Sequence, residues 1–222
     1  LEVGLSAGLT FPRFLAIHTT GLSHISAPKT RFEISYNYQN RPYYRRDLSS
    51  ASWSYSWRNL SNSSFTLRPI NINWVNVSYI DQKFFDGLMN EYLKRSYESQ
   101  LIVGMAGSYT YNNTRAESSL NQTLVRINVE LAGNTVDGLM HLLSKPVAGE
   151  KYYNFLGIRY SQYFRTDINL SQRIMLGEKC AIAGRLYAGI GVAYGNSQAI
   201  PFDRMFYAGG SNSMRGWAPR TL

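Results

Sequence analysis

Residues 52–58 read Ser-Trp-Ser-Tyr-Ser-Trp-Arg, and this stretch decides the fold class. Aromatic side chains stand at every second position, with a serine before each of them. A β-strand repeats every two residues and an α-helix every 3.6, so only a strand places the rings on one face and the hydroxyls on the other. The stretch predicts a strand with one apolar and one polar face.

The same alternation recurs along the chain, at lengths near the ~9–11 residues with which a strand crosses a membrane. It is found in residues 1–11, 31–39, 52–58, 65–79, 103–112, 125–131, 156–176 and 181–194. In 65–79 the apolar positions change phase near Pro69 and again near Trp74, and a β-bulge at each place would account for this. We count about eight strands before Asn196.

Charged residues lie on the polar face of the later strands, beside apolar residues on the other face. This arrangement fits a transmembrane barrel with a wet lumen and a lipid-facing outside. A soluble antiparallel sheet with one solvated face is the alternative. Its polar face would be richer in Lys and Glu than in Ser, Asn, Gly and Tyr. The predicted lumen-facing charges are Arg126, Glu130, Arg159, Arg165, Asp167 and Arg185.

The composition argues against several other classes of protein. No run of about 20 apolar residues predicts a membrane-spanning helix. The formal charge of +9 is dispersed and forms no basic block, so we predict no nucleic-acid partner. The three histidines lie in predicted loops without a nucleophile or carboxylate pattern, and the single Cys180 excludes a cysteine-pair zinc site. We therefore predict no enzyme activity, no metal and no cofactor.

The connections between the predicted strands alternate in length. Residues 59–64, 115–119 and 177–179 are short, whereas 81–100 and 133–153 are long. Outer-membrane barrels have short periplasmic turns and long extracellular loops, so we expect the long connections to fold over the barrel mouth. Residues 12–29 form an exception, because this long connection falls on the side that we assign to the periplasm.

The alternation stops in the C-terminal part of the chain. Gly209 and Gly210 permit positive backbone torsions, and Phe206, Tyr207 and Trp217 are bulky enough to anchor a folded-back loop against a wall. This composition predicts a long loop that packs back onto the barrel rather than a further strand.

This loop resembles the signature loop of the outer-membrane barrel-assembly superfamily, also called the bacterial surface antigen family. That family includes BamA-like and TamA-like insertases and two-partner-secretion transporters. In it, an Arg-Gly-aromatic tip on the sixth extracellular loop enters the lumen, where the Arg pairs with acidic or polar groups of later strands. The resemblance implies this role for Arg215. The matching motif residues are Gly209, Gly210, Ser213, Arg215, Gly216 and Trp217.

The flanking residues 201–202 and 219–222 further resemble versions of the loop in Bacteroidetes-type members. Family members have sixteen strands, so the resemblance implies that the chain corresponds to strands four to eleven. We expect residues 1–222 to be part of one barrel domain, with strands in about 1–194 and the loop in 196–222. The N-terminal POTRA domains and the terminal strands would lie outside this chain.

The resemblance implies a Gram-negative outer-membrane assembly factor that folds and inserts β-barrel clients, in the manner of the BAM complex. Its partners would be outer-membrane lipids, unfolded β-barrel proteins, and accessory lipoproteins or other periplasmic proteins. A polypeptide-secretion barrel of the same superfamily and a passive porin-like channel are the alternatives. The signature loop argues against the passive channel, but it does not separate insertion from secretion.

Overall fold

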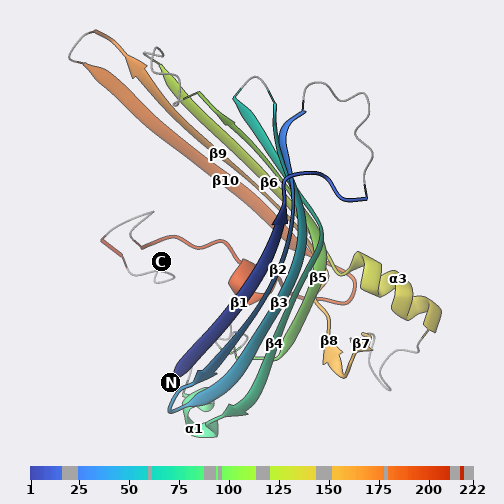
Figure 1. The fold of residues 1–222 in the computed structure, drawn as a ribbon. Helices are drawn as coiled ribbons and strands as arrows, with labels where there is room; N and C mark the ends of the chain where they lie inside the picture. Colours follow the sequence, from blue (N-terminus) through green and yellow to red (C-terminus); the bar gives the residue numbers. More distant parts are fainter. Residues whose placement is uncertain are drawn as a thin grey trace.

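A computed structural model of the chain describes residues 1–16, 25–59, 62–87, 94, 97–113, 121–143, 152–177, 180–210 and 216–217. Eight strands form one antiparallel sheet in the order β1-β2-β3-β4-β5-β6-β9-β10. The sheet is curved and open, with β1 and β10 as its two edges (Figure 1). The predicted fold class, an antiparallel sheet that forms part of a larger barrel, is confirmed.

The strands of the sheet are long enough to span a bilayer when tilted. They are β1 (Glu2–Phe11), β2 (Ile25–Asn40), β3 (Tyr44–Asn59), β4 (Ser63–Ile80), β5 (Gln100–Asn112), β6 (Gln122–Ala132), β9 (Tyr163–Met175) and β10 (Ala181–Ala193).

Among the elements that the structure describes, a hairpin of two short strands, two α-helices and a 3-10 helix lie outside the sheet. They are β7 (Asn154–Phe155), β8 (Ile158–Arg159), α1 (Gln82–Asp86), α3 (Asn134–Leu143) and the 3-10 helix η1 (Phe202–Arg204). Among the described residues, no helix has the length and apolar character needed to cross a membrane.

The two faces of the sheet differ in chemistry. We call the face that carries Glu130 and Asp167 the inner face, and the opposite one the outer face. Figure 1 shows η1 and α3 on opposite sides of the sheet. Large apolar side chains from every strand of the sheet except β3 are exposed on the outer face, as a lipid-facing surface requires. Among them are Leu5, Ile34, Leu67, Val129, Ile168, Leu186 and Ile190.

Aromatic side chains form a band at each end of the outer face. One is a row of contacting rings that includes Trp53 on Phe32 and Phe65 between Trp57 and Tyr109. The other includes the exposed Tyr36 and Trp74. From Phe65 to Trp74 the strand runs for about 30 Å at about 3.3 Å per residue. A tilt of about 40° makes the bands about 23 Å apart, close to the ~25 Å apolar band of outer-membrane barrels.

The connections fall at the two ends of the sheet as predicted. One end, the turn end, has the short connections from β3 to β4 and from β9 to β10. The other, the loop end, has the long connections from β4 to β5 and from β6 to β9 and the segment after β10. The connection from β2 to β3, residues 41–43, also lies at the loop end and is short, so it is an exception to the length rule. We assign the loop end to the cell exterior, because outer-membrane barrels carry their long loops there.

The long connection after β1 lies at the turn end, and its described part folds over the outer face. The ring of Phe14 stands edge-on against Tyr55 and Trp57, at 5.5 and 5.7 Å between ring centroids. The Thr30 hydroxyl accepts a hydrogen bond from the Leu15 amide, at 3.0 Å, and donates one to the Arg13 carbonyl, at 2.8 Å. These contacts give a physical reason for this exception to the loop-length rule.

Two predictions about the strands need correction. The predicted strand over 156–176 begins only at Tyr163, because Leu156 and Gly157 have positive φ angles of 53° and 79° and turn the β7-β8 hairpin. In β4 the register shift near Pro69 is confirmed, but none occurs at Trp74. The second shift in that strand lies at Ser78, opposite the Arg45–Arg46 step.

Candidate functional site

The segment that follows β10, residues 194–210, folds back onto the inner face, and we call it the C-terminal segment. Its Ile200 packs against a buried cluster of Ile102, Ala132 and Tyr163 on the inner face. The Cβ that a residue other than glycine would carry at position 191 would lie 2.5 Å from Ile200 Cδ1. The sheet and the segment are therefore complementary in shape.

Charged residues of β6 and β9 face the same segment. Glu130 is 8% exposed, and its carboxylate accepts a 2.8 Å hydrogen bond from the Tyr163 hydroxyl. Arg204 of η1 approaches this carboxylate at 3.7 Å and Arg165 at 3.9 Å. The guanidinium of Arg165 also lies 4.3 Å from the centre of the Phe206 ring. The buried Glu130 carboxylate thus attracts Arg204 of the C-terminal segment directly. It also attracts Arg165 of the wall, which contacts Phe206 of the same segment.

Asp167 extends this cluster toward the turn end. Its carboxylate accepts a 2.7 Å hydrogen bond from the Asn128 amide and lies 3.8 Å from Arg165. The Asn128 oxygen in turn accepts a 2.8 Å bond from the Ser108 hydroxyl. The cluster joins β5, β6 and β9 across their inner face, and it keeps Arg165 oriented toward Phe206.

The structure places the other predicted lumenal charges apart from this cluster. Arg126 and Arg185 lie on the inner face nearer the turn end, both exposed, and Arg185 donates a 3.0 Å bond to Asn169. Arg159 belongs to the β7-β8 hairpin, so its prediction as a wall residue of the last strands is wrong. Its guanidinium lies over Tyr152 at 4.4 Å and donates to the Asn196 carbonyl at 2.7 Å.

The described residues of the predicted loop motif are Gly209, Gly210, Gly216 and Trp217. Gly209 and Gly210 have φ angles of 93° and 91°, in the region that the sequence predicted for them. The Gly210 amide donates a 2.8 Å hydrogen bond to the Trp217 carbonyl, and Gly216 is exposed. Ser213 and Arg215 lie outside the described residues.

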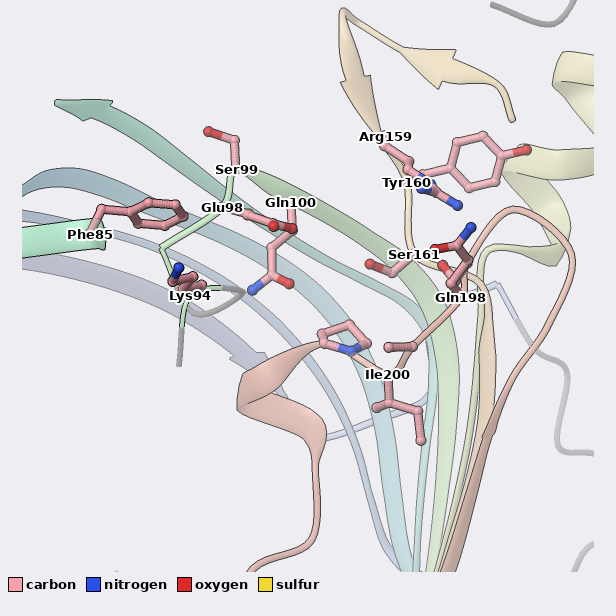
Figure 2. Close-up of a pocket in the computed structure, with 13 residues that line it drawn as sticks. Phe85, Lys94, Glu98, Ser99, Gln100, Arg159, Tyr160, Ser161, Gln198 and Ile200 are labelled. Atoms are coloured by element: carbon pink, nitrogen blue, oxygen red, sulfur yellow. The ribbon is translucent and has the colours of Figure 1, made fainter. Parts of the chain in front are cut away.

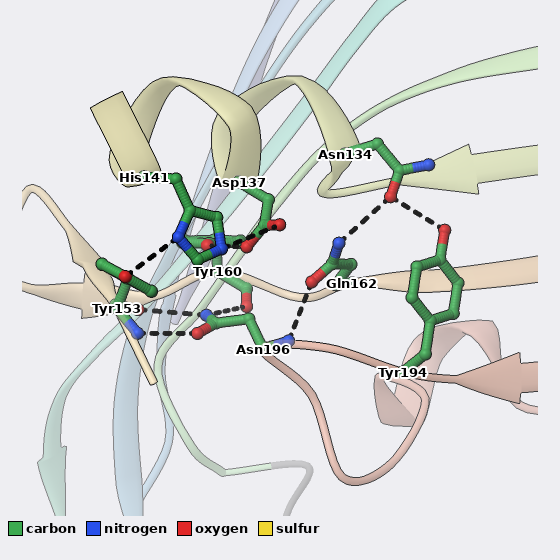
Figure 3. Close-up of polar contacts among 8 residues, drawn as sticks. All are labelled: Asn134, Asp137, His141, Tyr153, Tyr160, Gln162, Tyr194 and Asn196. Carbon is green, nitrogen blue, oxygen red and sulfur yellow. Dashed lines mark hydrogen bonds and ion pairs between the residues drawn. The ribbon is translucent and has the colours of Figure 1, made fainter. Parts of the chain in front are cut away.

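Buried amides fix the base of the C-terminal segment (Figure 3). Asn196, 3% exposed, donates to the carbonyls of Tyr153 and Tyr160 at 3.0 Å each and accepts from the Tyr153 amide at 2.7 Å. The Asn196 amide donates to Gln162 at 2.8 Å. Gln162 and Tyr194 both donate to the Asn134 side chain. The network joins the segment to the hairpin and to the start of α3.

A cavity of about 370 Å³ lies beside this base at the loop end (Figure 2). It is lined from the β4-β5 connection by Phe85, Lys94 and Glu98, and from the C-terminal segment by Gln198 and Ile200. Buried Tyr160 also borders it, and burial, followed by its hydrogen bond to Asp137, raises the pKa of that phenol. The phenol therefore stays protonated and remains a donor.

Several residues of the site were not predicted from the sequence. Phe206 was predicted only as an anchor, and Arg204, Gln162 and Asn196 were not predicted as site residues. The glycines at alternate positions 189 and 191 were an available signal, since glycine within a strand often marks a close approach of another part of the chain. The buried amides carry no comparable signal, because their partners are remote in sequence.

The model of the Omp85 superfamily domain matches residues 2–222. The chain belongs to the Omp85 superfamily. Among solved structures it is similar to BamA from Haemophilus ducreyi lacking POTRA domains 1–3, with a TM-score of 0.63 and 16% sequence identity. The match covers 100% of this chain and 38% of that one, so the chain spans less than half of the BamA chain and the likeness shows the fold. None of the curated proteins matches.

The predicted family is thereby confirmed, and this Omp85 chain is a bacterial outer-membrane β-barrel protein. Proteins of this superfamily assemble or translocate other proteins and are not enzymes, which agrees with the absence of a catalytic pattern in the sequence. The narrower resemblance to Bacteroidetes-type members stays a prediction.

Proposed function

We propose that this Omp85 protein folds and inserts β-barrel clients into the bacterial outer membrane. Membership of the superfamily supports a role in assembly or translocation. The observation that carries the proposal is the seat of the C-terminal segment, in which Glu130, Arg165 and Gly189 hold Arg204 and Phe206 against the inner wall. Such a seat would give a barrel that changes shape around a client a fixed reference for its lumenal loop.

The driving force would be backbone hydrogen bonding of the client. An unpaired amide in hydrocarbon costs several kcal/mol, so a client strand that finds a partner edge gains that free energy for each bond formed. The seated loop would keep the barrel competent for this exchange. Arg215 would pair with acidic or polar groups on later strands, because its planar fork of donors matches a carboxylate in a confined lumen.

The partners of the full-length protein would be unfolded β-barrel proteins, outer-membrane lipids, and accessory lipoproteins or other periplasmic proteins of a BAM-type complex. We assign no residue of this chain to the seam at which clients would enter, since the family's seam lies between its first and last strands.

Depletion of the full-length protein in its own cells tests the proposal. Quantitative proteomics of the outer membrane should show a broad loss of unrelated β-barrel proteins, accompanied by a periplasmic stress response. Selective loss of one exported partner, with other barrels unchanged, would instead identify a secretion barrel of the same superfamily. Unchanged barrels together with reduced uptake of small solutes would point to a channel.

A further inference from the structure

Helix α3 packs on the outer face of the sheet, although the sequence predicted that its connection would fold over the barrel mouth. Val136 and Met140 are buried against Leu101 and Tyr160, with Ile72 and Val103 beside them. Figure 1 shows α3 on the side of the sheet away from η1. The apolar pair Val136 and Met140 therefore covers part of the surface that faces lipid elsewhere on the sheet.

The strand register gives the height of α3 on that surface. Leu101, on which α3 packs, is the direct cross-strand partner of Trp74. Trp74 is exposed on the outer face and belongs to the aromatic band at the loop end. Aromatic bands of outer-membrane barrels lie at the boundary between the apolar core and the head groups. The helix is thus attached at the level of the outer boundary of the bilayer.

The remaining surface of α3 is divided into a polar and an apolar flank. Asp137 accepts a 2.6 Å hydrogen bond from the Tyr160 hydroxyl, and His141 lies 3.0 Å from the Tyr153 hydroxyl (Figure 3). At about 100° per residue, the leucines of α3 project nearly opposite to this pair. Leu139, Leu142 and Leu143 are exposed by 44%, 84% and 72%.

Hydrogen bonds at the first residue of α3 and along its polar flank attach the helix to the rest of the structure, so the exposed leucines have a defined position. The side chain of Asn134, the first residue of α3, accepts bonds from Gln162 at 3.1 Å and from Tyr194 at 2.9 Å. The polar flank is bonded to the β7-β8 region on the loop-end side. With one flank fixed toward the exterior, the opposite flank is directed toward the bilayer.

We propose that α3 is an interfacial helix whose Leu139, Leu142 and Leu143 enter the acyl-chain region of the outer leaflet. The leucines adjoin the lipid-facing surface of the sheet at its outer boundary. We therefore propose that lipid acyl chains, and not another protein, contact them. Residues 134–143 contain no Lys or Arg. The contact is therefore apolar, unlike that of interfacial helices that bind anionic lipid through basic residues. This lipid contact does not depend on whether the protein inserts clients or secretes them.

Lipid-quenching fluorescence of the full-length protein in phospholipid vesicles tests this contact. In a Cys180→Ser background, Leu142→Cys and Leu139→Cys would each carry an environment-sensitive fluorophore, and His141→Cys on the polar flank would be the matched control. Leu186→Cys on the outer face of β10 gives the reference for full lipid contact. Heat-dependent migration on gels would verify that each labelled variant is folded.

Lipids that carry a nitroxide on their acyl chains should quench the probes at 142 and 139 severalfold more than the probe at 141, and to an extent near that at 186. Emission at 142 and 139 should also be shifted to the blue. Equal, weak quenching at 142 and 141 would overturn the proposal, because the leucines would then face water. Blue-shifted emission without lipid quenching would also overturn it, because a protein would then cover them.

Discussion

The ring of Phe206 fills the space that a side chain at Gly189 would occupy, with only 2.6 Å between an ideal Cβ at Gly189 and the Phe206 Cζ atom. The same ring faces the Arg165 guanidinium at 4.3 Å and meets Tyr187 edge-on at 6.2 Å between ring centroids. A glycine, a cation and an aromatic ring of the wall thus form a pocket for one side chain of the C-terminal segment.

Gly189→Ala should release Phe206 from this pocket. An added methyl group in a filled space costs about 1–3 kcal/mol, because the ring must move or the strand must shift. We expect faster cleavage of the C-terminal segment by trypsin at Arg204 in the folded full-length protein. Gly184→Ala on the same strand is the control, since a Cβ there meets no atom within 4 Å. Equal cleavage of the two variants would refute the pocket.

Glu130→Gln should weaken the bond between the wall and the C-terminal segment. It removes the charge that Arg204 and Arg165 share and leaves two partly buried cations facing a neutral amide. Because both cations keep some solvent contact, we expect a loss of about 1–3 kcal/mol, less than for a fully buried pair. Urea unfolding in vesicles, followed by tryptophan fluorescence, would measure it.

The control for this prediction is Glu33→Gln. Glu33 forms a 3.2 Å ion pair with Arg31, with 42% and 55% of the two side chains exposed. An exposed pair of this kind contributes only about 0–1 kcal/mol. If both variants lost the same stability, Glu130 would be an ordinary surface carboxylate and not a tie to the segment.

Strand faces could be predicted from the sequence because the two faces meet different solvents. Ile34 is an apolar residue between the polar residues Glu33 and Ser35, so its face could be predicted from its immediate neighbours. The structure exposes Ile34 on the outer face. Val75 could not be placed in this way, because it is an apolar residue of the inner face, opposite Leu48. Val75 and Arg204 line the same cavity. The inner face around Val75 is therefore covered by a segment that lies more than a hundred residues later in the chain.

The candidate site was predicted in part for the same reason. Glu130, Arg165 and Asp167 alternate with apolar residues, so their common face follows from the strand period. Their arrangement around Phe206 and Arg204 depends on how the chain returns after β10, which no local pattern encodes. Arg159 was misplaced because a turn at Leu156, a residue other than glycine with a positive φ, interrupts the alternation.

Asn196→Asp should detach the β7-β8 hairpin from the base of the C-terminal segment. The carboxylate keeps the acceptor for the Tyr153 amide but loses both donors to the carbonyls of Tyr153 and Tyr160. Two buried acceptors left unpaired cost about 1–3 kcal/mol each. Hydrogen exchange should show faster exchange of the Tyr153 amide, whereas Gln198→Ala, at an exposed neighbour, should not. Unchanged protection in the aspartate variant would contradict the role of Asn196.

Ile34→Lys and Ser35→Lys should separate the lipid-facing side of β2 from its lumenal side. Ile34 is 61% exposed on the outer face, whereas the Ser35 hydroxyl bonds that of Ser50 on the inner face at 2.7 Å. A lysine in the apolar band costs about 2–4 kcal/mol near the bilayer midplane. In the wet lumen the cost is limited to one hydroxyl bond, about 1 kcal/mol. Folding yield and urea stability in vesicles should therefore fall much further for Ile34→Lys, and the reverse order would mean that we have assigned the faces of the sheet the wrong way round.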